Sequence, residues 1–102
     1  MKKILIIDDQ QLVLLSLKKS LTDLGYEVVS ADNVADAIVK YDTENPILVI
    51  VDINMSNSTL EESIQEHSSG LEVVKHIKHI KKDTTPIMVL SGNTNMFFTS
   101  FS

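Results

Sequence analysis

The segment Pro46–Asp52 constrains the fold more than any other stretch of the chain. A proline is followed by five apolar residues, mostly β-branched, and then by a carboxylate. An uninterrupted apolar run of this length is typical of a strand that is buried on both faces, as in a parallel sheet. A short buried helix has a similar composition, but the β-branching and the initial proline favour a strand. Asp52 then lies at the carboxyl end of that strand, where open α/β sheets place their ligands.

Two further segments have the same form. Residues 2–7 run into Asp8 and Asp9, and residues 86–90 run into Ser91. If the three strands are parallel neighbours, three carboxylates and one hydroxyl meet at one edge of the sheet. Asp and Ser also end strands simply because they favour turns. That explanation does not account for three acidic groups gathered together, because their charges repel one another, so we interpret the edge as a site.

Helical and extended segments alternate along the rest of the chain. Apolar residues at helical spacing predict an inward stripe on a first helix, residues 10–24, which Asp8 or Asp9 can cap and Gly25 closes. The stripe comprises Leu12, Leu14, Leu15, Leu17, Leu21 and Leu24. A short strand over 26–31 and a helix over 33–41, capped by Asn33, follow. The last helix is expected over 70–82, with Leu71, Val74, Ile77 and Ile80 inward. This order predicts an α/β fold, a doubly wound parallel sheet with helices on both faces.

The composition of the chain argues against two classes of partner. The 102 residues suit one domain, and the net charge is −5 with nine cationic residues, all lysines. This balance argues against nucleic acid as a partner, because binding it requires a basic face. No apolar run approaches the ~20 residues that span a bilayer, so we expect no membrane partner and a cytoplasmic location.

The acidic pair after the first strand, Asp52 after the third and Ser91-Gly92 after the fourth resemble a response regulator receiver domain of two-component signalling. The resemblance extends to Gly70 at the start of the last helix. It implies a flavodoxin- or CheY-like sheet in the order 2-1-3-4, with the fifth strand and fifth helix missing. We therefore expect residues 1–102 to form a single, truncated receiver domain.

The resemblance also implies a chemistry. In that family, the residue matching Asp52 accepts a phosphoryl group from a histidine kinase or a phosphotransfer protein. Mg²⁺ would be held by Asp8, Asp9, Asp52 and the backbone carbonyl of Asn54. The Ser91 hydroxyl would bind a phosphoryl oxygen. Mg²⁺ prefers oxygen ligands with room for phosphate and water, which agrees with this set.

The chain departs from the family pattern in three places. Residues 56–69 form an inserted loop that contains Glu61, Glu62 and Glu66, which is either a tolerated surface insertion or a partner-binding segment. The family lysine and the aromatic switch residue on the fifth strand are both absent. We therefore expect slow phosphorylation and impaired output. The alternative is a pseudo-receiver that acts only as an interaction or dimerisation module. A haloacid dehalogenase-type phosphatase would need a second Asp where Asn54 stands.

Two remaining features carry weaker predictions. Residues 94–102 form an apolar tail that includes Phe97, Phe98 and Phe101, and without a fifth strand the fourth strand would be an exposed edge. Either the tail folds back over that strand or two chains bury these surfaces together, and we expect a homodimer. His76 and His79 are spaced as a pair of metal ligands on a helix, but a solvated helix face explains them more simply.

Overall fold

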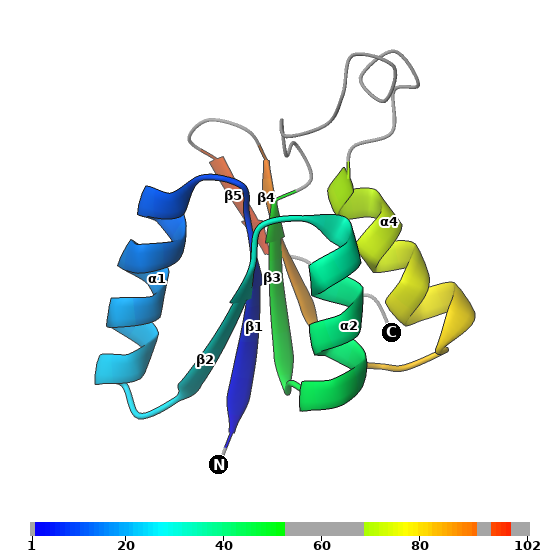
Figure 1. Ribbon diagram of the computed structural model, residues 1–102, viewed down its shortest axis with the longest axis horizontal. Coiled ribbons are helices and arrows are strands. Elements are labelled where there is room, and N and C mark those ends of the chain that lie inside the picture. Colours follow the sequence, from blue (N-terminus) through cyan, green and yellow to red (C-terminus); the bar gives the residue numbers. More distant parts are fainter. Residues whose placement is uncertain (1, 53–68, 92–94, 99–102) are drawn as a thin grey trace.

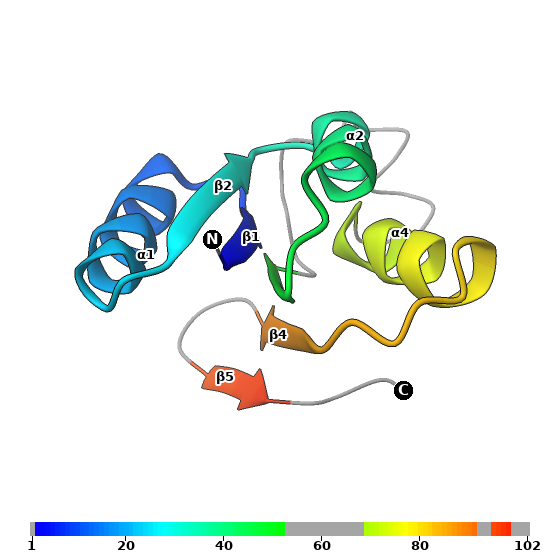
Figure 2. The ribbon, with the colours of Figure 1, turned by 90° about the horizontal axis from the view of Figure 1, so that it is seen from below.

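The computed structural model describes residues 2–52, 69–91 and 95–98, and of residues 69–71, 91 and 95–98 only the backbone. A five-stranded sheet forms the centre, with α1 on one face and α2 and α4 on the other (Figures 1 and 2). The strands are β1 (Lys3–Ile7), β2 (Glu27–Ala31), β3 (Leu48–Asp52), β4 (Ile87–Ser91) and β5 (Asn95–Phe98). The helices are α1 (Gln11–Asp23), α2 (Val34–Glu44), α4 (Ser69–Lys75) and its π-helical continuation η1 (His76–Ile80).

The first four strands are parallel and lie in the order β2-β1-β3-β4, as expected. The apolar run predicted to be a fully buried strand is β3, which pairs with β1 and β4 on its two sides. Val49 and Val51 are fully buried, and Ile50 is almost so. Burial on both faces explains why this run lacks the alternating pattern of a half-exposed strand.

The edge of β4 is not exposed, and this part of the expectation was wrong. Residues 95–98 turn back and pair with β4 in antiparallel orientation, with Ser91 opposite Asn95 and Met88 opposite Phe98. This β5 is a hairpin partner within the same chain, not the parallel fifth strand of the family. An antiparallel pair needs only a short connection, whereas a parallel one needs a crossover of a dozen residues or more. Phe101 lies outside the described residues.

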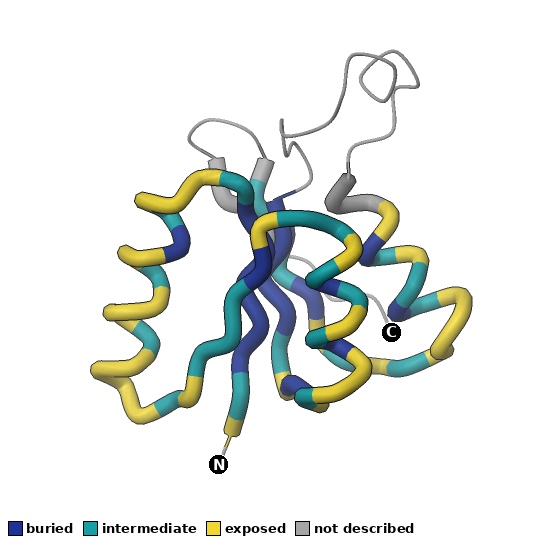
Figure 3. Tube along the Cα trace, in the orientation of Figure 1, coloured by how far each residue is buried: buried dark blue, intermediate teal, exposed yellow. Residues whose placement is uncertain are grey.

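The two faces of the sheet are packed unequally. On the face under α2 and α4, one cluster unites alternate residues of β1, β3 and β4 with Ala37, Tyr41, Val73 and Ile77 from the helices. The cluster on the α1 face has only four buried members, Ile4, Ile6, Leu14 and Ile50. Figure 3 shows the same contrast, with buried strands at the centre and a largely exposed α1.

Helix α1 contacts the sheet through a narrower stripe than the sequence indicated. Leu14 is buried, and Leu17 and Leu21 pack partly against the small cluster. Leu12, Leu15 and Leu24 are 81%, 63% and 72% exposed, so their predicted inward position was wrong. A single helix on a sheet face buries one side only, and a broad apolar stripe needs a second neighbour. The helix ends before Gly25 at φ 99°, the predicted left-handed position.

The other two helices follow the predicted pattern more closely. Asn33 caps α2, since its side-chain oxygen accepts a hydrogen bond of 2.8 Å from the Asp36 N–H. In the last helix Ile77 is fully buried as expected, and Val73 is buried as well, whereas Val74 only packs against the cluster. Ile80 is 70% exposed, because the helix widens to π geometry at His76 and its inward face changes phase. Within the described residues, none of the helices has the length and apolarity of a membrane span.

Candidate metal centre

Three carboxylates converge where β1 and β3 end. One oxygen from each of Asp8, Asp9 and Asp52 lies within 4.8 Å of the other two. Side chains alternate along a strand, so Asp8 and Asp52 continue the rows of Ile6 and Ile50, which are paired neighbours on the α1 face. The sequence predicted this meeting of acids from strand ends alone, and the structure brings all three together.

The carboxylates are mostly removed from solvent. Asp8 is 3% exposed and Asp52 is 6% exposed, while Asp9 is half-buried. Asp8 makes one backbone and one side-chain hydrogen bond. Its N–H donates to the Ala31 carbonyl at 3.1 Å, and its Oδ1 accepts from the Gln10 N–H at 2.9 Å. Gln10 is itself the N-cap residue of α1, so Asp8 fixes the turn before the helix and does not cap it directly.

The electrostatics of the cluster are unfavourable for three bare charges. Burial raises the pKa of Asp8 from 3.8 to about 6; the Gln10 N–H opposes the shift, and the nearby charges of Asp52 and Asp9 add to it. A cation between the oxygens would offset both the burial and the like-charge repulsion, because its positive charge favours the ionised carboxylates. The pKa of Asp8 therefore indicates a site in which a cation would stabilise the ionised forms.

Lys3, the lysine of β1, does not supply a positive charge to this acidic cluster. Lys3 begins β1 and so lies at the far end of the strand from Asp8. Its ammonium is 2.8 Å from Glu44 and 3.9 Å from Glu27, and the hydrogen bond and charge of Glu44 raise its pKa. On α2, Lys40 bonds the Ser30 carbonyl and pairs with Asp36 at 3.0 Å.

The donor set fits a hard cation. All three groups offer oxygen, which suits Mg²⁺, Ca²⁺ or Mn²⁺ and does not select zinc or copper. Ser91 ends β4, and Asp52 pairs in register with Leu90, so the Ser91 backbone belongs to the same edge. Its side chain and the predicted ligand Asn54 lie outside the described parts, as does all of the inserted loop but its last residue.

The two histidines of the last helix lie in different surroundings. His76 Nε2 lies 2.9 Å from Asp42 Oδ1 on α2, and the His76 side chain is only 13% exposed. His79 is exposed. The solvated-face interpretation therefore holds for His79 and was wrong for His76. No spacing in the sequence announces a contact with Asp42, which is thirty-four residues away.

The comparison with known families decides the identity. Residues 4–100 match the model of the response regulator receiver domain. The chain belongs to this family. The acidic cluster thus lies in a receiver domain, at the carboxyl edge of its sheet.

Individual relatives agree. The chain is 34% identical over 87 residues to the chemotaxis protein CheY of Bacillus subtilis, covering 84% of this chain and 64% of that one. It is 29% identical over 96 residues to the alkaline phosphatase synthesis transcriptional regulatory protein PhoP of the same species, covering 94% of this chain. The chain spans only 35% of the length of PhoP and 43% of the acid tolerance regulatory protein ActR of Rhizobium meliloti.

Solved structures show the same fold. The response regulator protein TrrA of Thermotoga maritima, determined in complex with Mg²⁺ and BeF, superposes with a TM-score of 0.73 at 35% identity. The match covers 92% of this chain and 72% of TrrA. CheY4 of Vibrio cholerae gives a TM-score of 0.74 at 28% identity, with 93% and 72% covered.

Proposed function

We propose that this receiver domain accepts a phosphoryl group on Asp52 from a phosphohistidine of a histidine kinase or phosphotransfer protein. The observation that carries the proposal is the convergence of Asp52 with Asp8 and Asp9 at one sheet edge. The similarity to TrrA, which was solved with Mg²⁺ and BeF, supports it.

Asp52 is suited to act as the nucleophile. It ends the central strand β3, which pairs on both sides and therefore holds the carboxylate on a rigid support. One carboxylate oxygen would attack phosphorus in line as the P–N bond of phosphohistidine breaks. The electron pair of that bond remains on the imidazole nitrogen, which takes up a proton, and an acyl phosphate remains on Asp52.

Asp8 and Asp9 would hold the metal, together with Asp52 and the Asn54 carbonyl. A bound Mg²⁺ supplies the positive charge that lets a phosphate approach the carboxylates. The Gln10 N–H keeps the Asp8 carboxylate oriented. Ser91 follows the β4 strand beside Asp52, and its hydroxyl would bind a phosphoryl oxygen and report the modification.

We further propose that labelling is slow and the output impaired. This is expected of the 102 residues taken by themselves, because their last lysine, Lys82, comes before β4. The metal would then be the main positive charge at the phosphoryl group.

Mass spectrometry after incubation with acetyl phosphate and Mg²⁺ tests the phosphoacceptor. We expect one added phosphoryl mass on the wild type, slowly acquired, and none on Asp52→Asn. Asp32→Asn, an exposed acid beyond the end of β2, is the matched control and should label like the wild type. Equal labelling of Asp52→Asn would exclude Asp52 as the acceptor.

Calorimetric titration with Mg²⁺ tests the metal ligands separately. The wild type should bind one ion, and Asp9→Ala should bind at least about tenfold more weakly because an oxygen ligand is lost. The exposed Asp23→Asn on α1 serves as control. If Asp9→Ala bound as tightly as the wild type, the ligand assignment would be wrong.

The alternative, a pseudo-receiver that only binds partners, predicts no labelling even with Mg²⁺ bound.

We also propose that the chain forms a homodimer through β5, because the edge of β4 is already covered by β5. Within the described part of the chain β5 is the outer strand, and its residues 95–98 carry neither charge nor proline to protect an edge. Sedimentation of the full chain should give a dimer at tens of micromolar, and Phe97→Pro should give a monomer. A wild-type monomer at that concentration would refute dimerisation.

A further inference from the structure

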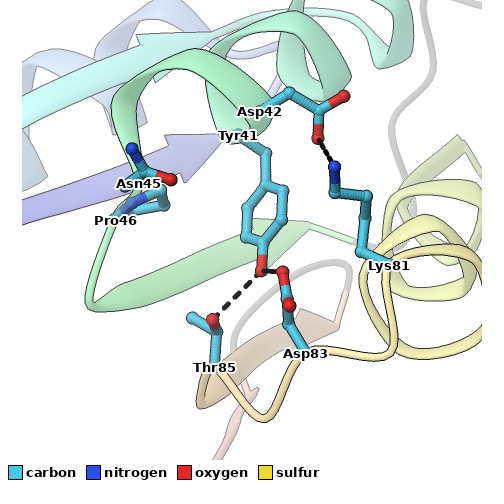
Figure 4. A pocket seen from close by; sticks show the side chains of 7 residues that line it. All are labelled: Tyr41, Asp42, Asn45, Pro46, Lys81, Asp83 and Thr85. Carbon is cyan, nitrogen blue, oxygen red and sulfur yellow. Dashed lines mark hydrogen bonds and ion pairs between the residues drawn. The ribbon is translucent and has the colours of Figure 1, made fainter.

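Three elements meet around Tyr41 at the amino ends of β3 and β4, opposite the acidic edge (Figure 4). Tyr41 lies on α2 and is 4% exposed. Its hydroxyl donates to Asp83 Oδ2 at 2.6 Å and is 3.0 Å from Thr85 Oγ1, both in the loop that leads to β4. Burial and the Asp83 hydrogen bond raise the pKa of Tyr41 to about 12, so the phenol stays a donor. The loop is thereby attached to α2.

Asp42, the next residue of α2, contacts the helix that precedes this loop. His76 Nε2 is 2.9 Å from Asp42 Oδ1. The His76 ring also meets the Tyr41 ring edge to face, with centroids 6.3 Å apart and planes at 89°. Tyr41 and Asp42 thus contact both ends of the segment 76–85.

The segment between these contacts has an uncommon backbone. Residues 76–80 are π-helical, and the Lys81 N–H donates to the His76 carbonyl at 2.9 Å. Lys82 has a φ of 56°, the left-handed region that favours glycine. The Lys78 ammonium bridges the Asp83 and Thr85 carbonyls at 3.2 and 2.8 Å. A π-helical turn and a left-handed lysine are kept where the surrounding contacts hold the backbone in place, and both are often found at functional positions.

We propose that His76 and Asp42 form a proton-dependent clamp, in which protonation of His76 tightens the hold of α2 on residues 76–85. Histidine is the side chain that ordinarily changes charge between about pH 5 and 8. With the imidazolium, the bond to Asp42 becomes charge-assisted and therefore stronger. The entry to β4 is then more firmly anchored at acidic pH.

Other charges near the clamp both favour and oppose protonation. Besides Asp42 and the neutral phenol of Tyr41 on α2, the titratable groups of these elements are Lys81 and Asp83 in the loop and Glu72, Lys75, Lys78 and His79 on the same helix. Lys81 lies 3.9 Å from the same Asp42 oxygen that is 2.9 Å from His76. Because the histidine contact is shorter and less exposed, Asp42 acts mainly on His76.

Amide hydrogen exchange by NMR at pH 5 and pH 8, corrected for intrinsic exchange rates, tests the clamp. We expect residues 77–85 of the wild type to be about two- to fivefold better protected at pH 5, the range that a partly exposed ion pair supplies. His76→Gln can keep a hydrogen bond but cannot titrate, so its protection should not depend on pH. Asp42→Asn should behave likewise. The control Asp23→Asn removes an exposed ion pair on α1 and should retain the wild-type pH dependence.

A wild type without pH-dependent protection of this segment would overturn the proposal. So would an Asp42→Asn variant that keeps it. The His76 and His79 ring signals of the wild type provide a measurement without variants, because the amide shifts of residues 77–85 should follow the titration of His76 and not that of His79. The opposite assignment also overturns the clamp.

Discussion

The two faces of the sheet use the same strands in different ways. Under α2 and α4, Val73 and Ile77 meet the strands in a closed core. On the α1 side, Leu14 is the only buried residue of α1 itself, and Leu48, Met88 and Leu90 are only partly covered. The same alternation that sends Leu5 and Val49 to the closed face leads along the other face to Asp8 and Asp52. The closed face thus holds the fold together, and the sparse face ends in the candidate metal centre.

Truncating the closed core should have the largest effect. Ile77→Ala removes a fully buried side chain and leaves a cavity, so we expect the free energy of unfolding to fall by about 2–5 kcal/mol. Leu15→Ala on α1, where the side chain is 63% exposed, should change it by less than about 0.5 kcal/mol. Urea denaturation measures both. Equal losses would show that α1 is packed as tightly as η1.

Removing one charge from the acidic end of the sparse face should raise the free energy of unfolding. Asp8 has a folded pKa of about 6 against 3.8 as its ordinary value, so the folded protein binds more protons between these values. Stability of the metal-free protein therefore falls as the pH rises from about 4 to about 6. Asp8→Asn should be more stable by about 3 kcal/mol at pH 7.5, with the difference disappearing below about pH 4.

Urea titrations in EDTA at several pH values give this difference directly. Asp23→Asn is the exposed control and should show no such pH profile. If Asp8→Asn were destabilised at pH 7.5, the carboxylate would be a stabilising group and our view of the cluster would be wrong.

Neighbouring residues of β4 offer a comparison within one strand. Val89 is 8% exposed on the closed face, whereas Leu90 is half-buried on the sparse face. We expect Val89→Ala to cost about 2 kcal/mol and Leu90→Ala about 1 kcal/mol, although the second change removes more carbon. Thermal or urea unfolding decides. A larger loss at Leu90 would indicate that something covers the sparse face in solution, such as a second chain.

The smallest effect concerns backbone strain in the exposed loop that follows η1. Lys82 has a φ of 56°, so Lys82→Gly should raise the free energy of unfolding by about 0.5–1 kcal/mol. Lys81 is in the right-handed region at φ −84°, and Lys81→Gly should lower stability instead. Opposite signs for these adjacent residues, measured by urea denaturation, would confirm that the strain is local to Lys82.

Strong local signals made much of the fold predictable. The run 47–51 is long, apolar and β-branched, so a buried central strand was the natural interpretation. Asn33 and Gly25 marked a helix start and a helix end through well-defined capping chemistry. The acids were predicted to meet because the carboxyl ends of parallel strands share one edge. The failures have a different origin. Leu12 and Leu15 follow the helical period as well as Leu14 does, and their exposure depends on whether a second helix lies beside α1.

The sequence by itself determined the first four strands and the converging carboxylates, because strand period and strand ends are local properties. The order of the four strands was implied by the resemblance to the receiver family. Only the tertiary structure decided that residues 95–98 return to β4, that His76 faces Asp42, and that Tyr41 meets Asp83 and Thr85. The contacts of His76 and Tyr41 join residues 34 to 44 positions apart. The energies of all these contacts depend on packing and burial, which composition and spacing do not specify.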